Sequence, residues 1–192
     1  MCGRYYIDET VASDIERLVM ELDRQMKHRQ AGDIYPTQTA PVICSKGKVL
    51  YGADMKWGFE TKDHKQLINA RAETALEKPS FSDSVMHRRC IIPATKFYEW
   101  NREKQKVTFS HPASPSIYMA GIYRMDGDGP HFVILTTAAN ISMSPVHDRM
   151  PLILEEQNIK RWIFEDDKVK EILAKPSPML ERQQDYEQLS LF

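Results

Sequence analysis

The sequence predicts an α+β fold built as a single compact domain. Short strand-like segments fill the middle of the chain, and helix-like segments lie apart from them instead of alternating with them. The 192 residues are 42% hydrophobic and 28% charged, which suits one globular domain with a sizeable core. We expect this domain to span residues 2–175, followed by a flexible, polar and proline-containing tail over 176–192.

The first half of the chain is expected to mix helices and strands. Apolar residues at helical spacing predict a helix over 11–27, with Thr10 as its N-cap. Two apolar runs, 41–45 and 49–57, predict a hairpin that turns at 46–48. The polar residues 62–65 predict a loop, and a short helix is expected over 72–77.

The second half is expected to be rich in strands and to end in helices. Residues 126–129 form an Asp-Gly-Asp-Gly turn signal between the last two strands. Strands are predicted at 90–93, 97–100, 106–110, 117–123 and 132–137, and two closing helices at 155–164 and 168–174.

Composition excludes several classes of protein. No apolar run approaches the ~20 residues that span a bilayer, and no signal-peptide layout is present, so we expect a cytoplasmic protein. The three cysteines form no C-x-x-C pair, which argues against a disulfide framework and a zinc site. Cys44 and Cys90 lie in apolar runs and are expected to be buried, inert thiols. The net charge of −1 means that any nucleic-acid site must be a local patch.

Cys2 directly follows the initiator methionine, and this placement points to unusual chemistry. Removal of Met1 would leave a cysteine with both a free α-amine and a thiol. The amine has a pKa of about 8, so part of it is neutral at physiological pH. It could capture an aldehyde as an imine that the thiol closes to a thiazolidine, or it could activate the thiol for amide hydrolysis. The remaining alternative is that position 2 carries a small residue by chance and that Cys2 has no chemical role.

Three polar segments interrupt the apolar pattern. Glu99 lies among aromatic residues, where desolvation favours acid–base chemistry, although an alternating strand could turn it to solvent. His147 lies between Pro145 and Pro151 and could contact phosphate or sugar oxygens, or be structural. Asn69 begins a segment that also contains the Arg71 guanidinium and the Glu73 carboxylate, which could form a site. Alternatively, Asn69 is the N-cap of an ordinary helix.

Two tryptophans could stack nucleobases. Trp57 precedes a flexible Gly58-Phe59 pair, and Trp100 ends the aromatic segment that contains Glu99. Exposed indole rings bind unpaired bases with about 1–3 kcal/mol per base, whereas buried ones only contribute to the core.

Taken together, these segments resemble the SRAP (SOS response-associated peptidase) family of abasic-site processing proteins. The similarity runs from residue 2 to about residue 165, and each motif alone is weak. In order, the motifs are Cys2-Gly3-Arg4, Trp57-Gly58, 69–74 (Asn-Ala-Arg-Ala-Glu-Thr), 89–93 (Arg-Cys-Ile-Ile-Pro), 97–100 (Phe-Tyr-Glu-Trp), Ala120-Gly121 and 147–151 (His-Asp-Arg-Met-Pro). The resemblance implies a barrel-like mixed β-sheet core flanked by helices, and a groove for single-stranded DNA.

The resemblance also implies roles for individual residues. Cys2 would capture the aldehyde of an abasic site, and lyase or peptidase-type chemistry could accompany this capture. Asn69 would orient Cys2, Glu99 would shuttle protons, and His147 would assist opening of the sugar. Backbone phosphates would be held by Arg4, Arg71 and Arg149, with Trp57 and Trp100 as stacking platforms and Arg88 and Arg89 extending the patch. No cofactor or metal is expected, and the protein is expected to act as a monomer.

The last five residues form a second motif. Gln188-Leu189-Ser190-Leu191-Phe192 resembles the peptide by which bacterial proteins dock on the replicative sliding clamp. A polar linker before it would provide the tether. Alternatively, Leu189, Leu191 and Phe192 dock on the protein's own core.

The leading interpretation is a sensor that crosslinks itself to abasic sites in single-stranded DNA. An N-terminal cysteine hydrolase would use the same Cys2 but has no need of arginines and tryptophans around it. A non-covalent single-strand-binding module would use the arginines and tryptophans without Cys2.

Overall fold

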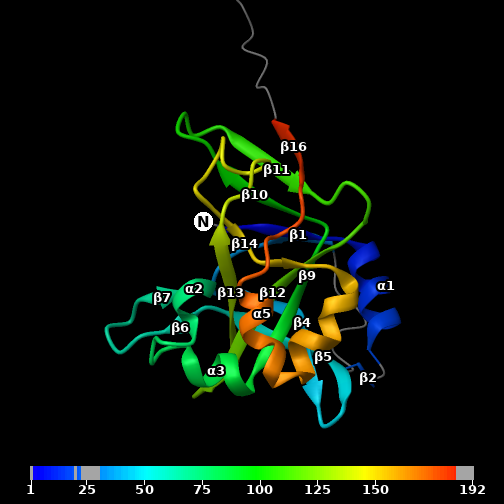
Figure 1. The fold of residues 1–192 in the computed structure, drawn as a ribbon, viewed down its shortest axis with the longest axis vertical. Coiled ribbons are helices and arrows are strands. Elements are labelled where there is room, and N and C mark those ends of the chain that lie inside the picture. The colour runs from blue at the N-terminus through cyan, green and yellow to red at the C-terminus, as the bar shows by residue number, and fades with distance from the viewer. Residues whose placement is uncertain (1, 20, 23–30, 185–192) are drawn as a thin grey trace, which may run out of the picture.

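The computed structural model describes residues 2–19, 21–22 and 31–184 (Figure 1). Its core is a closed mixed barrel of five strands. They are β4 (Thr39–Lys46), β5 (Val49–Trp57), β9 (Arg89–Ala94), β12 (Ile117–Asp126) and β13 (Gly129–Ala138). Antiparallel pairing runs in the order β5-β4-β9-β12-β13, and β13 closes the ring by parallel pairing with β5. The predicted α+β domain with a barrel-like core is confirmed.

A second, five-stranded sheet lies across one end of the barrel (Figure 1). In spatial order it contains β16 (Glu181–Gln184), β11 (Lys106–Ser110), β10 (Lys96–Trp100), β1 (Tyr5–Ile7) and β3 (Gly32–Ile34). Only Thr95 separates β9 from β10, so one length of chain runs from the barrel into this sheet. The sheet is therefore fixed relative to the barrel.

Short elements surround the barrel. The helices are α1 (Glu9–Leu18), α2 (Ala72–Ala75), α3 (Ser82–His87), α4 (Ile159–Phe164) and α5 (Val169–Leu173), with 3-10 turns η2 (Glu156–Asn158) and η3 (Asp166–Lys168). The remaining strands are β2 (Glu21–Leu22), β6 (Phe59–Glu60), β7 (Gln66–Leu67), β8 (Asn69–Arg71), β14 (Arg149–Pro151) and β15 (Ile153–Leu154). Within the described residues, no helix is long and apolar enough to cross a membrane.

The strands follow the predicted pattern closely, and the first helix does not. β5 and β11 match their predicted ranges, and Cys44 and Cys90 are buried free thiols as expected. The predicted helix over 11–27 is wrong at residues 19 and 21–22, because Val19 is already extended and residues 21–22 pair with β5. Residues 20 and 23–27 of that prediction lie outside the described part of the chain. Asp8 rather than Thr10 is the N-cap, and its Oδ1 accepts from the Thr10 amide at 2.9 Å.

The prediction of a flexible tail from residue 176 is wrong for residues 177–184. Ser177 and Leu180 are buried, and the Asn140 side chain donates to the carbonyl oxygens of Ser177 and Pro178. Residues 181–184 then add β16 to the edge of β11. The unpaired backbone groups of an edge strand favour this addition even for a polar segment. Residues 188–192 lie outside the described part of the chain.

Candidate functional site

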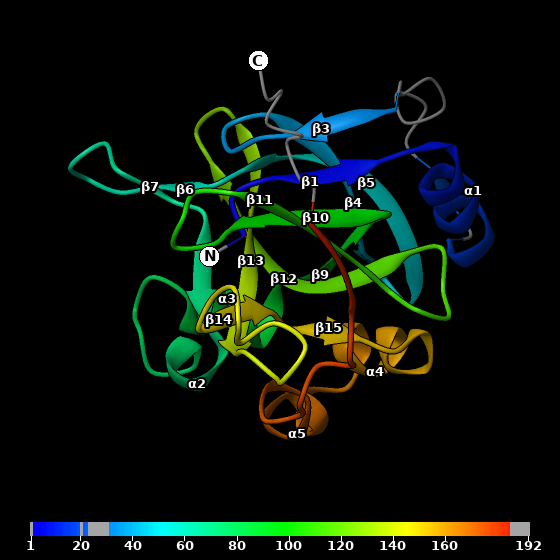
Figure 2. The ribbon, with the colours of Figure 1, turned by 90° about the horizontal axis from the view of Figure 1, so that it is seen from above.

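Residues 2–4 lie where the second sheet, β16-β11-β10-β1-β3, meets the barrel; this sheet is called the upper sheet below. In both views β1, which directly follows residues 2–4, runs beside β10 (Figures 1 and 2), and the Tyr98 amide donates to the Arg4 carbonyl oxygen. β8 and β14 flank the last residues of β13, with Asn69 opposite Ile134 and Arg149 opposite Ala138. The topology thus brings together four segments that are far apart in the sequence: 2–4, 69–71, 96–100 and 147–151.

Cys2 is buried in the full chain, which still begins with Met1. The Asn69 side-chain nitrogen donates to the Cys2 carbonyl oxygen at 3.1 Å. The Asn69 Oδ1 atom is also buried and has no hydrogen-bond partner among the described residues. Asn69 therefore fixes the position of Cys2 and keeps a buried acceptor beside it.

Glu99 is only 4% exposed, so it does not face solvent, and its charge acts on the Cys2 thiol. Burial raises the pKa of the Cys2 thiol well above its ordinary value, and the Glu99 carboxylate raises that pKa further. The thiol is accordingly protonated at neutral pH. Glu99 is thus a buried carboxylate whose charge is felt at Cys2, which makes it the candidate acid–base group of this site.

His147 lies on the loop between β13 and β14. It lines an open pocket of about 720 Å³ together with Trp100, the 101–103 turn and residues 144–148. The His147 Nδ1 atom accepts from the Arg149 amide at 2.9 Å, which orients the ring. Trp100 is 37% exposed, so its indole is open to a ligand.

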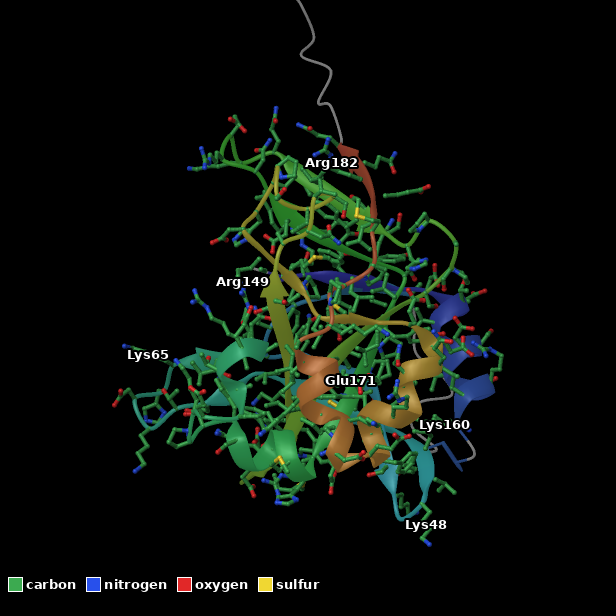
Figure 3. All side chains as sticks on the ribbon, in the orientation of Figure 1. Lys48, Lys65, Arg149, Lys160, Glu171 and Arg182 are labelled. Carbon is green, nitrogen blue, oxygen red and sulfur yellow. The ribbon has the colours of Figure 1, made fainter. Side chains whose placement is uncertain are left out.

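The three predicted phosphate-binding arginines differ in their surroundings. Arg149, seen beside the tip of β13 in Figure 3, makes two bonds to the Glu73 carboxylate at 2.7 and 2.8 Å. Arg149 thereby lowers the pKa of Glu73. Arg4 pairs with Asp33 at 3.2 Å. Arg71 is exposed, so it is the arginine best placed to meet a phosphate.

Two sequence predictions at this site are wrong. Trp57 is fully buried: its indole nitrogen donates to the Ile68 carbonyl, and its ring packs between Tyr5 and Phe132. It joins the upper sheet to the barrel and offers no stacking platform. Arg89 is also buried, where it bonds backbone carbonyls of α3 and α4, and so it does not extend a basic patch.

The structure adds residues that the sequence did not single out. Asp33 lies in β3 and forms an ion pair with Arg4 of the neighbouring segment. Tyr35 directly follows β3, and its ring lies against the Arg4 guanidinium. Lys78 joins Asn69 and Arg71 around a hollow of about 280 Å³. No motif marks these positions, because the contacts join residues that are separated by 7 to 31 positions in the sequence.

The chain is similar to known proteins over most of its length. The family model for SOS response associated peptidase (SRAP) matches residues 1–190. The chain is 32% identical to the abasic site processing protein YoqW of Bacillus subtilis, covering 85% of this chain and 80% of that protein. It is 26% identical to abasic site processing protein YedK of Escherichia coli, covering 89% and 83%. A crystal structure of a Bacteroides thetaiotaomicron protein matches with a TM-score of 0.77 and 25% identity, over 95% of this chain and 91% of that one.

Proposed function

Since this chain belongs to the SOS response associated peptidase family, we propose that it processes abasic sites in single-stranded DNA by capturing them covalently through Cys2. The observation that supports this most directly is the buried group of Cys2, Asn69 and Glu99. Removal of Met1 would convert the Cys2 amide nitrogen into a free α-amine inside this group. The crosslink would shield the lesion during replication and repair.

The capture reaction follows from the two functional groups of Cys2. The α-amine attacks the aldehyde carbon of the opened deoxyribose, and the resulting carbinolamine loses water to give an imine. The thiol then adds across the C=N bond: a C–S bond forms, and the sulfur proton moves to the nitrogen. The product is a thiazolidine, which keeps the DNA attached. The imine is also the intermediate of β-elimination, so we infer minor lyase activity from the same site.

In the chain that carries Met1, burial raises the pKa of the Cys2 thiol, and the same burial after Met1 removal would favour a reaction that starts at the amine. A protonated thiol is a poor nucleophile, so the amine attacks first. Glu99 then accepts the thiol proton during ring closure, and the reverse transfer would allow the crosslink to reopen. The buried Asn69 Oδ1 offers an acceptor to the α-amine.

The same protonation state counts against an N-terminal cysteine hydrolase. Such an enzyme needs the thiolate as its first nucleophile, and both burial and Glu99 oppose this form of Cys2. The pocket beside His147 and Trp100 is open and partly aromatic, which suits an unpaired strand better than a peptide. Arg71 and Lys78 at the neighbouring hollow supply positive charge for its phosphates.

The crosslink itself is the test of this function. We expect purified protein, incubated with single-stranded DNA that carries one abasic site, to give a shifted band on a denaturing gel. The Cys2→Ala variant should give no band, because alanine lacks the thiol that makes the adduct stable. Cys44→Ala serves as the matched control, since this thiol is buried elsewhere, and it should crosslink like wild type. Absence of the band in wild-type protein that begins at Cys2 contradicts the proposed function.

We further propose that Gln188, Leu189, Leu191 and Phe192 bind the replicative sliding clamp. Because β16 ends at Gln184, only residues 185–187 separate this peptide from the folded domain. At ~3.5 Å per residue, such a spacer holds a bound clamp close to the upper sheet. In a pull-down, the clamp should recover the full chain and lose a chain truncated after Glu187. Equal recovery of both would refute clamp binding.

A further inference from the structure

Arg4 is enclosed by aromatic rings in the upper sheet. Its guanidinium carbon lies 4.9 Å from the ring centre of Tyr35, 5.0 Å from that of Trp100 and 5.5 Å from that of Tyr98. β1 runs between β3 and β10, so Tyr35 just after β3 and Trp100 at the end of β10 flank the start of β1. These distances are those of cation–π contacts.

The charge of Arg4 is already neutralised inside this group. Arg4 Nη1 donates to Asp33 Oδ2 at 3.2 Å, and the Tyr35 hydroxyl donates to the same oxygen at 3.4 Å. A phosphate approaching Arg4 would also meet the Asp33 carboxylate, which repels it. Arg4 is therefore better suited to hold two rings in place than to bind the DNA backbone.

Tyr35 is held rigidly although it is exposed. Its amide donates to the Gln38 side chain at 2.9 Å, and the Gln38 amide donates back to the Tyr35 carbonyl at 3.2 Å. The same turn is attached to the barrel, because the Thr37 amide donates to the Trp57 carbonyl at 2.8 Å. These bonds fix the backbone of Tyr35, and the Arg4 guanidinium lies against its ring, so the side chain loses little freedom when a ligand stacks on it.

Exposed aromatic rings are scarce in the described part of the chain. They are Tyr35 at 42%, Trp100 at 37% and Phe164 at 37% exposure, and the first two flank Arg4. Arg4 follows Cys2 by two residues, so its Cα lies within ~7 Å of the Cys2 Cα. The two rings contact the Arg4 side chain and therefore belong to the surroundings of the capture site. Planar rings near a capture site for single-stranded DNA suit an unpaired base, because every base has a π-face.

We propose that Tyr35 and Trp100 form a stacking surface for an unpaired nucleobase that flanks the lesion. Arg4 contacts both rings, and Asp33 holds Arg4 in place. This inference rests on the proposed function and adds Tyr35 as a DNA-contacting residue. It also assigns Arg4 a positioning role instead of a phosphate contact.

Affinity for single-stranded DNA tests the role of Tyr35. Loss of one stacked base lowers affinity about 5- to 150-fold, which we expect for both Tyr35→Ala and Tyr35→Leu. Tyr35→Phe keeps the ring and should bind like wild type. Phe164→Ala removes an equally exposed aromatic ring from α4 and should have no effect. The loss should be the same at about 50 and 200 mM salt, because stacking releases no counterions.

A base-deletion cycle separates stacking from a structural role. Each nucleotide flanking the lesion is replaced in turn by a stable spacer without a base. In wild type, deleting the base at one position should lower affinity, and in Tyr35→Ala the same deletion should cost clearly less, because only Trp100 is left to stack on it. Losses that add at every position, or binding by Tyr35→Ala at the wild-type level, overturn the inference. If the wild type crosslinks to the abasic strand in these samples, either failure leaves the proposed function standing.

Discussion

Replacing Glu99 with glutamine is expected to slow crosslink formation by about 10²–10⁴-fold, the range that a positioned general acid–base contributes. Glutamine keeps the shape of the side chain and removes its ability to carry a proton between the thiol and the nitrogen. Because Glu99 is only 4% exposed, binding of undamaged single-stranded DNA should stay at the wild-type level. Single-turnover gel kinetics and a separate binding titration measure the two quantities.

The matched control for Glu99 is Glu77→Gln, which removes an exposed carboxylate just beyond α2. This variant should crosslink at the wild-type rate. A Glu99→Gln protein that crosslinks as fast as wild type would remove Glu99 from the chemistry. A slow variant that also loses DNA binding would instead indicate a damaged site.

Replacing Arg89 with methionine is expected to destabilise the fold by about 3–5 kcal/mol, because it removes a buried guanidinium and leaves several backbone carbonyls without a donor. Arg89 donates to the carbonyls of Val85 and Ile163, at the ends of α3 and α4, and to the Asp166 carboxylate. These carbonyls have no intrahelical partner and become unsatisfied when the guanidinium is lost. Urea unfolding of both proteins measures the difference in free energy.

The neighbouring Arg88 provides the control for this effect. Arg88 is 33% exposed and pairs with Asp83, also on the surface. Arg88→Met should therefore change the free energy of unfolding by no more than about 1 kcal/mol. Equal destabilisation by the two substitutions would contradict the capping role of Arg89.

The strands and the residues of the capture site could be predicted from the sequence because their signals are local. Apolar runs bounded by turns located β4, β5 and β11, and an acidic residue among aromatics identified Glu99. The resemblance to the SRAP family implied that Asn69 orients Cys2, and a hydrogen bond joins them. Local signals of this kind remain valid when distant segments come together.

Contacts between distant segments could not be predicted in the same way. Trp57 and Trp100 are both tryptophans beside aromatic residues, but only the packing of Tyr5 and Phe132 decides that Trp57 is buried. The polar residues 181–184 lack strand periodicity and become β16 because the edge of β11 accepts them. Tyr35 gains its significance only from Arg4, 31 residues away in the sequence.

The central claim is that both the amine and the thiol of Cys2 react with the abasic site. The most direct measurement is mass spectrometry of the N-terminal peptide from crosslinked protein, after nuclease digestion and treatment with iodoacetamide. We predict a peptide that begins at Cys2, carries the sugar remnant with loss of one water, and has a thiol that resists alkylation. A remnant on a lysine, or a crosslinked Cys2 whose thiol is alkylated, would contradict capture as a thiazolidine.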